Sequence, residues 1–162
     1  MIRFDVIDAT FNLRHKNAIK NWIKEIICSK NRAVGSVNYL FASDSYVLEV
    51  NRKYLNHDFY TDIITFDTSD YEYPIHSGVN DDKLSADIVI SLDTVLANSA
   101  AYGSTFTNEL YRVMAHGLLH LLGYDDLTPE DAELMRKAED ESLSLLQKFS
   151  LADDQVYTFK SN

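Results

Sequence analysis

Long apolar segments and cysteines are both scarce in this chain of 162 residues. No apolar run approaches the roughly 18 residues that a membrane-spanning helix needs, and the first residues lack the basic-then-apolar pattern of a secretory leader. The single cysteine, Cys28, excludes an intramolecular disulfide and is typical of a reducing compartment. With only 5 glycines and 2 prolines, the composition also excludes collagen-like and low-complexity chains. These absences predict a cytoplasmic protein that does not associate with membranes.

Basic residues are in the minority, and they are unevenly distributed. The chain carries 15 Lys and Arg against 25 Asp and Glu, for a formal net charge of −10. This balance argues against a polyanionic partner, because like charges repel at long range. Residues 1–60 nevertheless have a net charge of +3, and residues 61–162 one of −13. Two interpretations therefore stay open: a basic N-terminal face that binds a polyanion, or the solvated face of an ordinary helix.

The spacing of the apolar residues predicts the secondary structure. The predicted strands are 2–7, 36–42, 61–67 and 86–91, and the predicted helices are 16–29, 45–54, 92–101, 106–122 and 129–147. This order predicts an α+β (mixed α/β) fold, a single layered domain with one mixed sheet of about four strands packed with about five helices. Helices between the early strands favour parallel pairing, whereas 61–67 and 86–91 could pair antiparallel. We expect the domain to span 1–152, followed by a polar C-terminal tail over 153–162, and an exposed loop over 69–82.

Two histidines lie four residues apart in one predicted helix. His116 and His120 project from the same helical face, as neighbours that can reach one metal ion at about 2.0–2.1 Å each. Gly123 follows, and glycine readily adopts the left-handed conformation that ends helices, so the chain can reverse there. Either Asp125 or Asp126 can then return toward the two imidazoles. The spacing predicts a three-ligand metal site with an open fourth position, which is typical of catalytic sites. The alternative is a helix end with two histidines that only pack or cap.

Gly117 stands directly after the first histidine, where zinc peptidases carry a glutamate. That glutamate is the general base of those enzymes, so its absence makes peptide hydrolysis a minor hypothesis.

Five blocks of the sequence occur in an order and at a spacing that match one known family. The blocks are HGLLHLLGYDD at 116–126, N-x-x-Y at 51–54, TDIITF at 61–66, ADIVI at 86–90 and E-x-x-R at 109–112. They resemble the H-G-x-L-H-L-x-G-Y-D-H signature and the N-x-x-Y, T-D-V-L-S-F, G-D-I-V-I and E-x-x-R blocks of the YbeY family of endoribonucleases and rRNA maturation factors. The resemblance extends over roughly residues 45–145.

The resemblance implies a metal-dependent endoribonuclease specific for single-stranded RNA. It would act in rRNA 3′-end maturation and in small ribosomal subunit assembly and quality control, with rRNA, the subunit and assembly factors as partners. It implies His116, His120 and Asp126 as ligands of one zinc ion, without an organic cofactor. Arg112 and Glu109 are the catalytic candidates. Arg112 could hold a phosphate oxygen or form a salt bridge with Glu109 or another acid.

Three departures from the family pattern bear on the chemistry. The third histidine of the family is Asp126 here, and two histidines with one carboxylate also suit iron, nickel or manganese. Leu55 stands where the family has an arginine that helps to hold the RNA phosphate, and 56–60 replaces a lysine- and proline-containing link. Two alternatives therefore stay open: a non-catalytic ribosome-assembly factor with a structural metal, or a metallohydrolase with a non-RNA substrate. Asp62 or Asp87 could orient a histidine ligand, or could only cap a helix or a strand.

Overall fold

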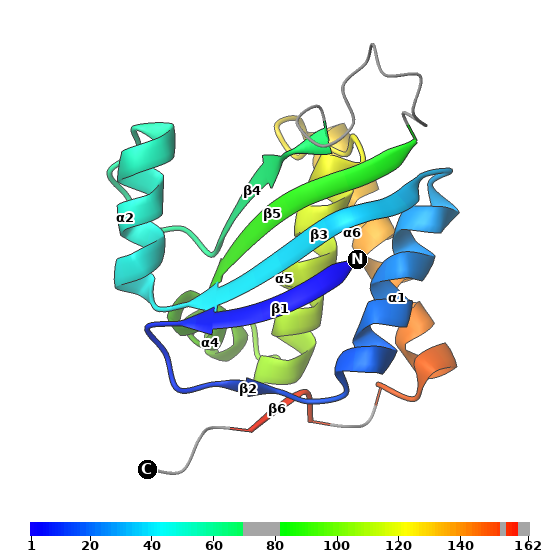
Figure 1. Cartoon of the computed structure of the whole chain (residues 1–162), viewed down its shortest axis with the longest axis horizontal. Coiled ribbons are helices and arrows are strands. Elements are labelled where there is room, and N and C mark those ends of the chain that lie inside the picture. The colour runs from blue at the N-terminus through cyan, green and yellow to red at the C-terminus, as the bar shows by residue number, and fades with distance from the viewer. Residues whose placement is uncertain (70–81, 153–154, 159–162) are drawn as a thin grey trace.

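A four-stranded mixed sheet forms the centre of the computed structural model, which describes residues 1–69, 82–152 and 155–158 (Figure 1). In spatial order the strands are β1 (Ile2–Ile7), β3 (Ala33–Ala42), β5 (Lys83–Ser91) and β4 (Ile63–Asp67). β1, β3 and β5 run parallel, and β4 pairs antiparallel with β5 at one edge of the sheet. Both predicted modes of pairing are confirmed, and so is the α+β fold class.

Helices cover the two faces of the sheet unequally (Figure 1). Val37, Tyr39 and Phe41 of β3 alternate toward the large core that the sheet shares with α1 and α5, whereas Val89 of β5 faces a smaller core beneath α2. This alternation follows from the two-residue period of a strand. The helices are α1 (Lys16–Ser29), α2 (Asp44–Leu55), α4 (Leu92–Ala101), α5 (Phe106–Leu121) and α6 (Pro129–Ser144), and α6 continues into the 3-10 helix η1 (Leu145–Phe149). None of the described helices is both long and apolar enough to cross a bilayer.

Two short strands were not predicted from the sequence. β2 (Asn12–Leu13) and β6 (Tyr157–Thr158) pair antiparallel, and the buried Val156 accepts a hydrogen bond from the Arg14 N–H at 2.7 Å. The described part of the predicted tail is thus packed against the domain. Strands of two residues carry no periodicity for a sequence pattern to detect. Of the loop predicted over 69–82, residues 70–81 lie outside the described part of the chain.

α5 lies very close to the sheet, and it carries the histidine pair. A Cβ added at Gly117 would approach the Cδ1 of Ile63 to 2.6 Å, so the absence of a side chain lets the helix approach β4. From the middle of the sheet, the Tyr39 hydroxyl donates a hydrogen bond of 3.0 Å to the carbonyl oxygen of Met114. These two contacts fix the height of α5 above the sheet.

The Tyr39 hydrogen bond is testable because the side chain is fully buried. Tyr39→Phe removes the donor while it preserves the ring, and we expect it to lower the free energy of unfolding by about 1 kcal/mol. Tyr102→Phe is the matched control, since Tyr102 is 72% exposed. Urea denaturation followed by circular dichroism measures both variants. Equal stability of the two variants would show that the bond does not help to hold α5.

Candidate metal centre

The chain reverses direction immediately after α5. Gly123 has a φ of 104°, in the left-handed region that favours glycine. Its N–H donates to the carbonyl oxygen of His120 at 3.1 Å, and the Tyr124 N–H donates to that of Leu119 at 2.9 Å. These two bonds form a Schellman motif, which ends the helix and satisfies its last carbonyl groups. The reversal predicted at Gly123 is confirmed.

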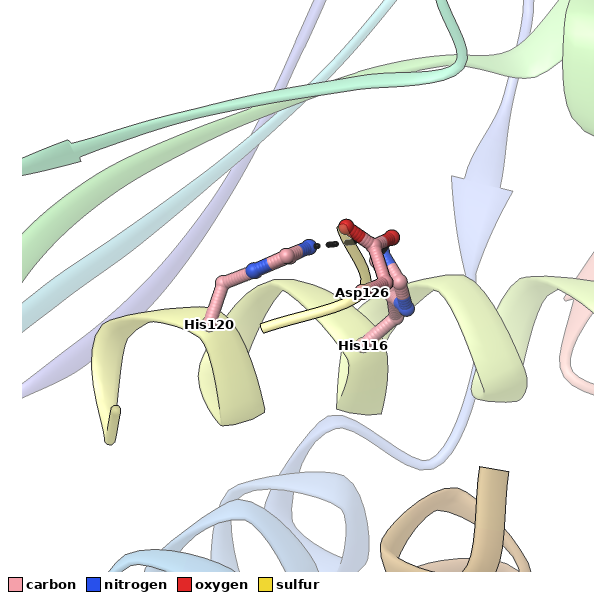
Figure 2. Close-up of side chains that lie close together, drawn as sticks. All are labelled: His116, His120 and Asp126. Carbon is pink, nitrogen blue, oxygen red and sulfur yellow. Dashed lines mark ion pairs between the residues drawn. The ribbon is translucent and has the colours of Figure 1, made fainter. Parts of the chain in front are cut away.

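The reversal brings Asp126 back to the two histidines (Figure 2). The Oδ2 atom of Asp126 lies 3.7 Å from Nε2 of His116 and 3.6 Å from Nε2 of His120. One ligand atom from each residue can be chosen so that all three lie within 4.8 Å of one another. Ligand atoms about 2.1 Å from a tetrahedral zinc ion would be roughly 3.4 Å apart, so the cluster is close to the size that such an ion needs.

Each imidazole is oriented through its second ring nitrogen. Nδ1 of His120 lies 3.0 Å from the carbonyl oxygen of Tyr124, and Nδ1 of His116 lies 2.8 Å from Oε2 of Glu139 on α6. A carbonyl or an ionised carboxylate can only accept, so each Nδ1 carries a proton, and in the neutral ring Nε2 then keeps its lone pair. Both lone pairs are therefore available to a cation beside Asp126. A histidine ligand held by a carboxylate or carbonyl is the usual arrangement around protein-bound metals.

Glu139 links the centre to a buried ion-pair network. Its side chain is 9% exposed, and its Oε1 accepts a hydrogen bond of 2.9 Å from Arg112, which also donates to Asp140 at 2.9 Å. Burial by itself raises the pKa of Glu139, but its hydrogen bonds to His116 and Arg112 outweigh burial and lower it. For His116 the signs are reversed. Burial by itself would lower the pKa of this histidine, but the hydrogen bond to the ionised Glu139 outweighs burial and raises it. The carboxylate therefore stays ionised and keeps the His116 ring in place.

The two catalytic candidates lie outside the three-residue cluster. Arg112 forms the salt bridge that was one of its two predicted roles, but with Glu139 and Asp140 as partners instead of Glu109. The Glu109 side chain is buried on α5, and burial, partly offset by Arg112, raises its pKa. A contact of Arg112 with phosphate and a general-base role for Glu109 stay predictions.

The residue that orients His116 was missed by the sequence prediction. The sequence had offered Asp62 and Asp87 for this role. Asp87 accepts a hydrogen bond of 2.9 Å from the Asn38 side chain, and Asp62 influences His116 through its charge. Of the roles open to these two aspartates, the contact that orients the His116 ring is made by Glu139 instead. A signal for Glu139 was present: it is the charged residue within the buried stripe of α6, whose other members are Met135, Ala138 and Ser142.

Comparisons with known proteins point to one family. Residues 5–147 match the family described as Endoribonuclease YbeY. A protein of Cytophaga hutchinsonii with that name is 44% identical over 138 residues, which cover 85% of this chain and 90% of the relative. A protein of the same name from Flavobacterium psychrophilum is 41% identical, with 90% and 96% covered. A solved protein from Thermotoga maritima shares the fold, with a TM-score of 0.57, 24% identity, and 96% of this chain and 97% of the other covered.

Substitution of Glu139 tests whether this residue orients a metal ligand. We expect Glu139→Gln to weaken zinc binding by about 10- to 100-fold, because the amide no longer holds the charge and geometry that fix the His116 ring. Competition with a chromophoric chelator measures the affinity. Glu133→Gln makes the same chemical change at an exposed position of the same helix. If both variants bind zinc equally well, Glu139 does not position the ligand.

The choice between neighbouring aspartates is a separate test of the site. Asp126→Ala removes the carboxylate that lies beside both Nε2 atoms, whereas Asp125 is outside the cluster. We expect Asp126→Ala to reduce the zinc affinity by more than about 100-fold, because losing a ligand should cost more than the roughly 10- to 100-fold that follows loss of a residue that only orients a ligand. Asp125→Ala should bind zinc as the parent protein does. Tight zinc binding by Asp126→Ala would exclude Asp126 as the third ligand.

Proposed function

This chain belongs to the endoribonuclease YbeY family, and from that premise we propose that it is a metal-dependent endoribonuclease that cuts single-stranded RNA. Its proposed role is rRNA 3′-end maturation and the assembly and quality control of the small ribosomal subunit. The observation that carries the proposal is the convergence of two Nε2 lone pairs and the Asp126 carboxylate on one point. Three ligands leave a further coordination position for substrate, as catalytic metal sites require.

We infer that His116, His120 and Asp126 hold one divalent ion, with zinc as the first choice. The donor set fits zinc, and its single carboxylate also suits iron, nickel or manganese. Two neutral imidazoles and one carboxylate leave a formal charge of +1 on the site, so a phosphate group is still attracted to it. When bound, the ion supplies Lewis-acid activation of a phosphoryl oxygen or of the attacking water.

The residues around the ligands have distinct tasks in this proposal. Glu139 and the Tyr124 carbonyl keep both imidazoles in the tautomer that can bind a cation. Arg112 keeps Glu139 in place through its salt bridge. Lys30, at the end of α1, lies with its Nζ 5.1 Å from the centre of the Tyr124 ring. It therefore places a positive charge of the basic N-terminal segment beside the residue whose carbonyl orients His120, and in this proposal it would contact an RNA phosphate.

The proposed substrate also defines the proposed partners and location. An enzyme of rRNA maturation would encounter its RNA on the small ribosomal subunit, together with assembly factors. Such particles occupy the cytoplasm, which agrees with the single cysteine of the chain and with described helices too short or too polar to cross a bilayer.

The proposed activity is tested with an rRNA precursor and the purified, metal-loaded protein. We expect cleavage within unpaired segments, and expect both a chelator and His116→Ala to reduce it to background, because either change removes the ion or one of its ligands. Asp125→Ala should cleave at the parent rate, since its side chain is outside the cluster. Cleavage by His116→Ala at the parent rate would come from a contaminating nuclease. RNA binding by a metal-loaded protein that never cleaves would favour the non-catalytic assembly factor.

A further inference from the structure

Strand β1 uses only one of its two sides for pairing. In the sheet order β1-β3-β5-β4 it is an outer strand, and it pairs with β3 along its whole length without a bulge (Figure 1). The Val37 N–H of β3 donates to the carbonyl oxygen of Met1. Because hydrogen bonds alternate along a parallel pair, the odd-numbered residues of β1 direct their backbone groups toward β3. The N–H and C=O groups of the even-numbered residues, Ile2, Phe4 and Val6, therefore point away from the sheet.

The outer side of β1 is uncovered in the part of the chain that the structure describes. No hydrogen bond between described residues reaches the outward groups, since β2 pairs with β6 and α1 packs more against β3 than against β1. Val6 and Ile7 are 38% and 39% exposed. Proteins commonly protect such an edge with prolines, bulges or unmatched charges. β1 has neither a proline nor a bulge, so its charges determine what can pair with it.

The two charged residues of β1 match one antiparallel register with a second copy of the strand. The outward groups occur on every second residue, so even-numbered residues must lie opposite even-numbered ones. Pairing centred on Phe4 meets this condition and places Arg3 of each copy directly opposite Asp5 of the other. Pairing centred on Arg3 or on Asp5 also meets it, but then each central residue faces its own like charge. Opposite charges stabilise such cross-strand pairs and like charges destabilise them, so the sequence selects the register centred on Phe4.

The backbone and the side chains are both satisfied in this register. Phe4 faces Phe4 and Ile2 faces Val6, and the residues of each pair exchange both N–H···O bonds. Arg3 and Asp5 occupy the positions between these pairs, where side chains on opposite strands approach most closely. Both are exposed, and neither forms an ion pair with another described residue. A second copy can therefore engage both without breaking an existing ion pair.

The other outer strand of the sheet has no comparable match. β4 contains a single charged residue, Asp67, so no register of β4 with itself brings opposite charges together. β4 also lies beside the metal centre, because its Ile63 approaches α5 at Gly117. Pairing through β1, at the opposite edge of the sheet, would leave both metal centres of a dimer uncovered.

We propose that β1 is an interface between two copies of this chain, which pair antiparallel about Phe4 and join their sheets into one continuous sheet. The contact is isologous, as in most homodimers, because one strand supplies both members of each Arg3–Asp5 pair. A single strand edge buries little surface, so the dimer is weak and depends on protein concentration. This inference concerns assembly and does not depend on the proposed action on RNA.

Charge reversal tests both the dimer and its register. Sedimentation equilibrium from about 1 µM to about 1 mM covers the range in which such a small interface assembles. We expect Arg3→Asp and Asp5→Arg each to raise the dissociation constant of the dimer by about 10- to 100-fold, because like charges then face each other in both pairs. Glu133→Arg makes the same change of charge as Asp5→Arg at an exposed position of α6, and should dimerise as the parent does.

Two samples should restore the dimer. In an equimolar mixture of the two single variants, the copy with two carboxylates meets the copy with two guanidinium groups, so a heterodimer forms. The double variant, Arg3→Asp with Asp5→Arg, exchanges the charges and should dimerise as the parent does. A parent that stays monomeric up to about 1 mM would overturn the interface. Dimerisation that survives either single reversal, or that neither sample restores, would exclude this register.

A separate variant tests the backbone contribution. Val6→Pro removes an outward N–H that no bond within the sheet uses, and proline is tolerated where the N–H of an outer strand faces solvent. We expect a folded protein by circular dichroism whose dimer is weaker than that of the parent. Equal dimerisation of this folded variant and the parent would show that the strands do not pair through the outer side of β1.

Discussion

The left-handed turn at Gly123 is the constraint on which the site depends. Continued as a helix, the chain would carry Asp126 about 9 Å past His120 along the axis, too far away to share an ion. No atom lies within 4 Å of a Cβ built at Gly123, so its backbone conformation, with φ of 104°, and not a lack of space favours glycine there. The same turn aims the Tyr124 carbonyl at the His120 ring. One residue without a side chain thus positions both the Asp126 carboxylate, the third candidate ligand, and the carbonyl group that orients the second histidine.

The sequence predicted the parts of the site that depend on local geometry. The spacing of His116, His120 and Gly123 is read within one helix and one turn, and the YbeY resemblance drawn from five blocks is confirmed over most of the chain. The sequence did not predict contacts between segments that are far apart in the chain. Glu139, which contacts His116, lies 23 residues after it on another helix, and β6, near the end of the chain, pairs with β2 near its beginning. The order of the strands in the sheet could not be predicted either, because β5 lies between β3 and β4 although it follows both of them in the chain. Local periodicity predicts elements, whereas packing decides which of them meet.

The Glu139 network also explains why Arg112 took one of its two predicted roles. Its guanidinium donates to Glu139 and Asp140, and the first of these carboxylates is nearly buried. Moving Arg112 to a phosphate would leave a buried carboxylate with one partner fewer, which is strongly unfavourable. In the structure, Arg112 thus contacts the carboxylate that orients His116, and a contact with phosphate would require it to give up at least one of its two ion pairs.

The acidic composition is less of an obstacle to RNA than the net charge suggests. Part of the surplus of −13 over residues 61–162 lies at the metal centre, in Asp126, Glu139 and Asp140. There Arg112 and, in the proposed state, a divalent ion neutralise it. Net charge describes attraction over distances comparable to the Debye length, about 8 Å at physiological ionic strength, whereas a bound strand meets individual groups at contact distance. At that range the proposed divalent ion, with its formal charge of +1 after the ligands are counted, would attract a phosphate despite the net charge of the chain, so an acidic composition is compatible with a polyanionic substrate.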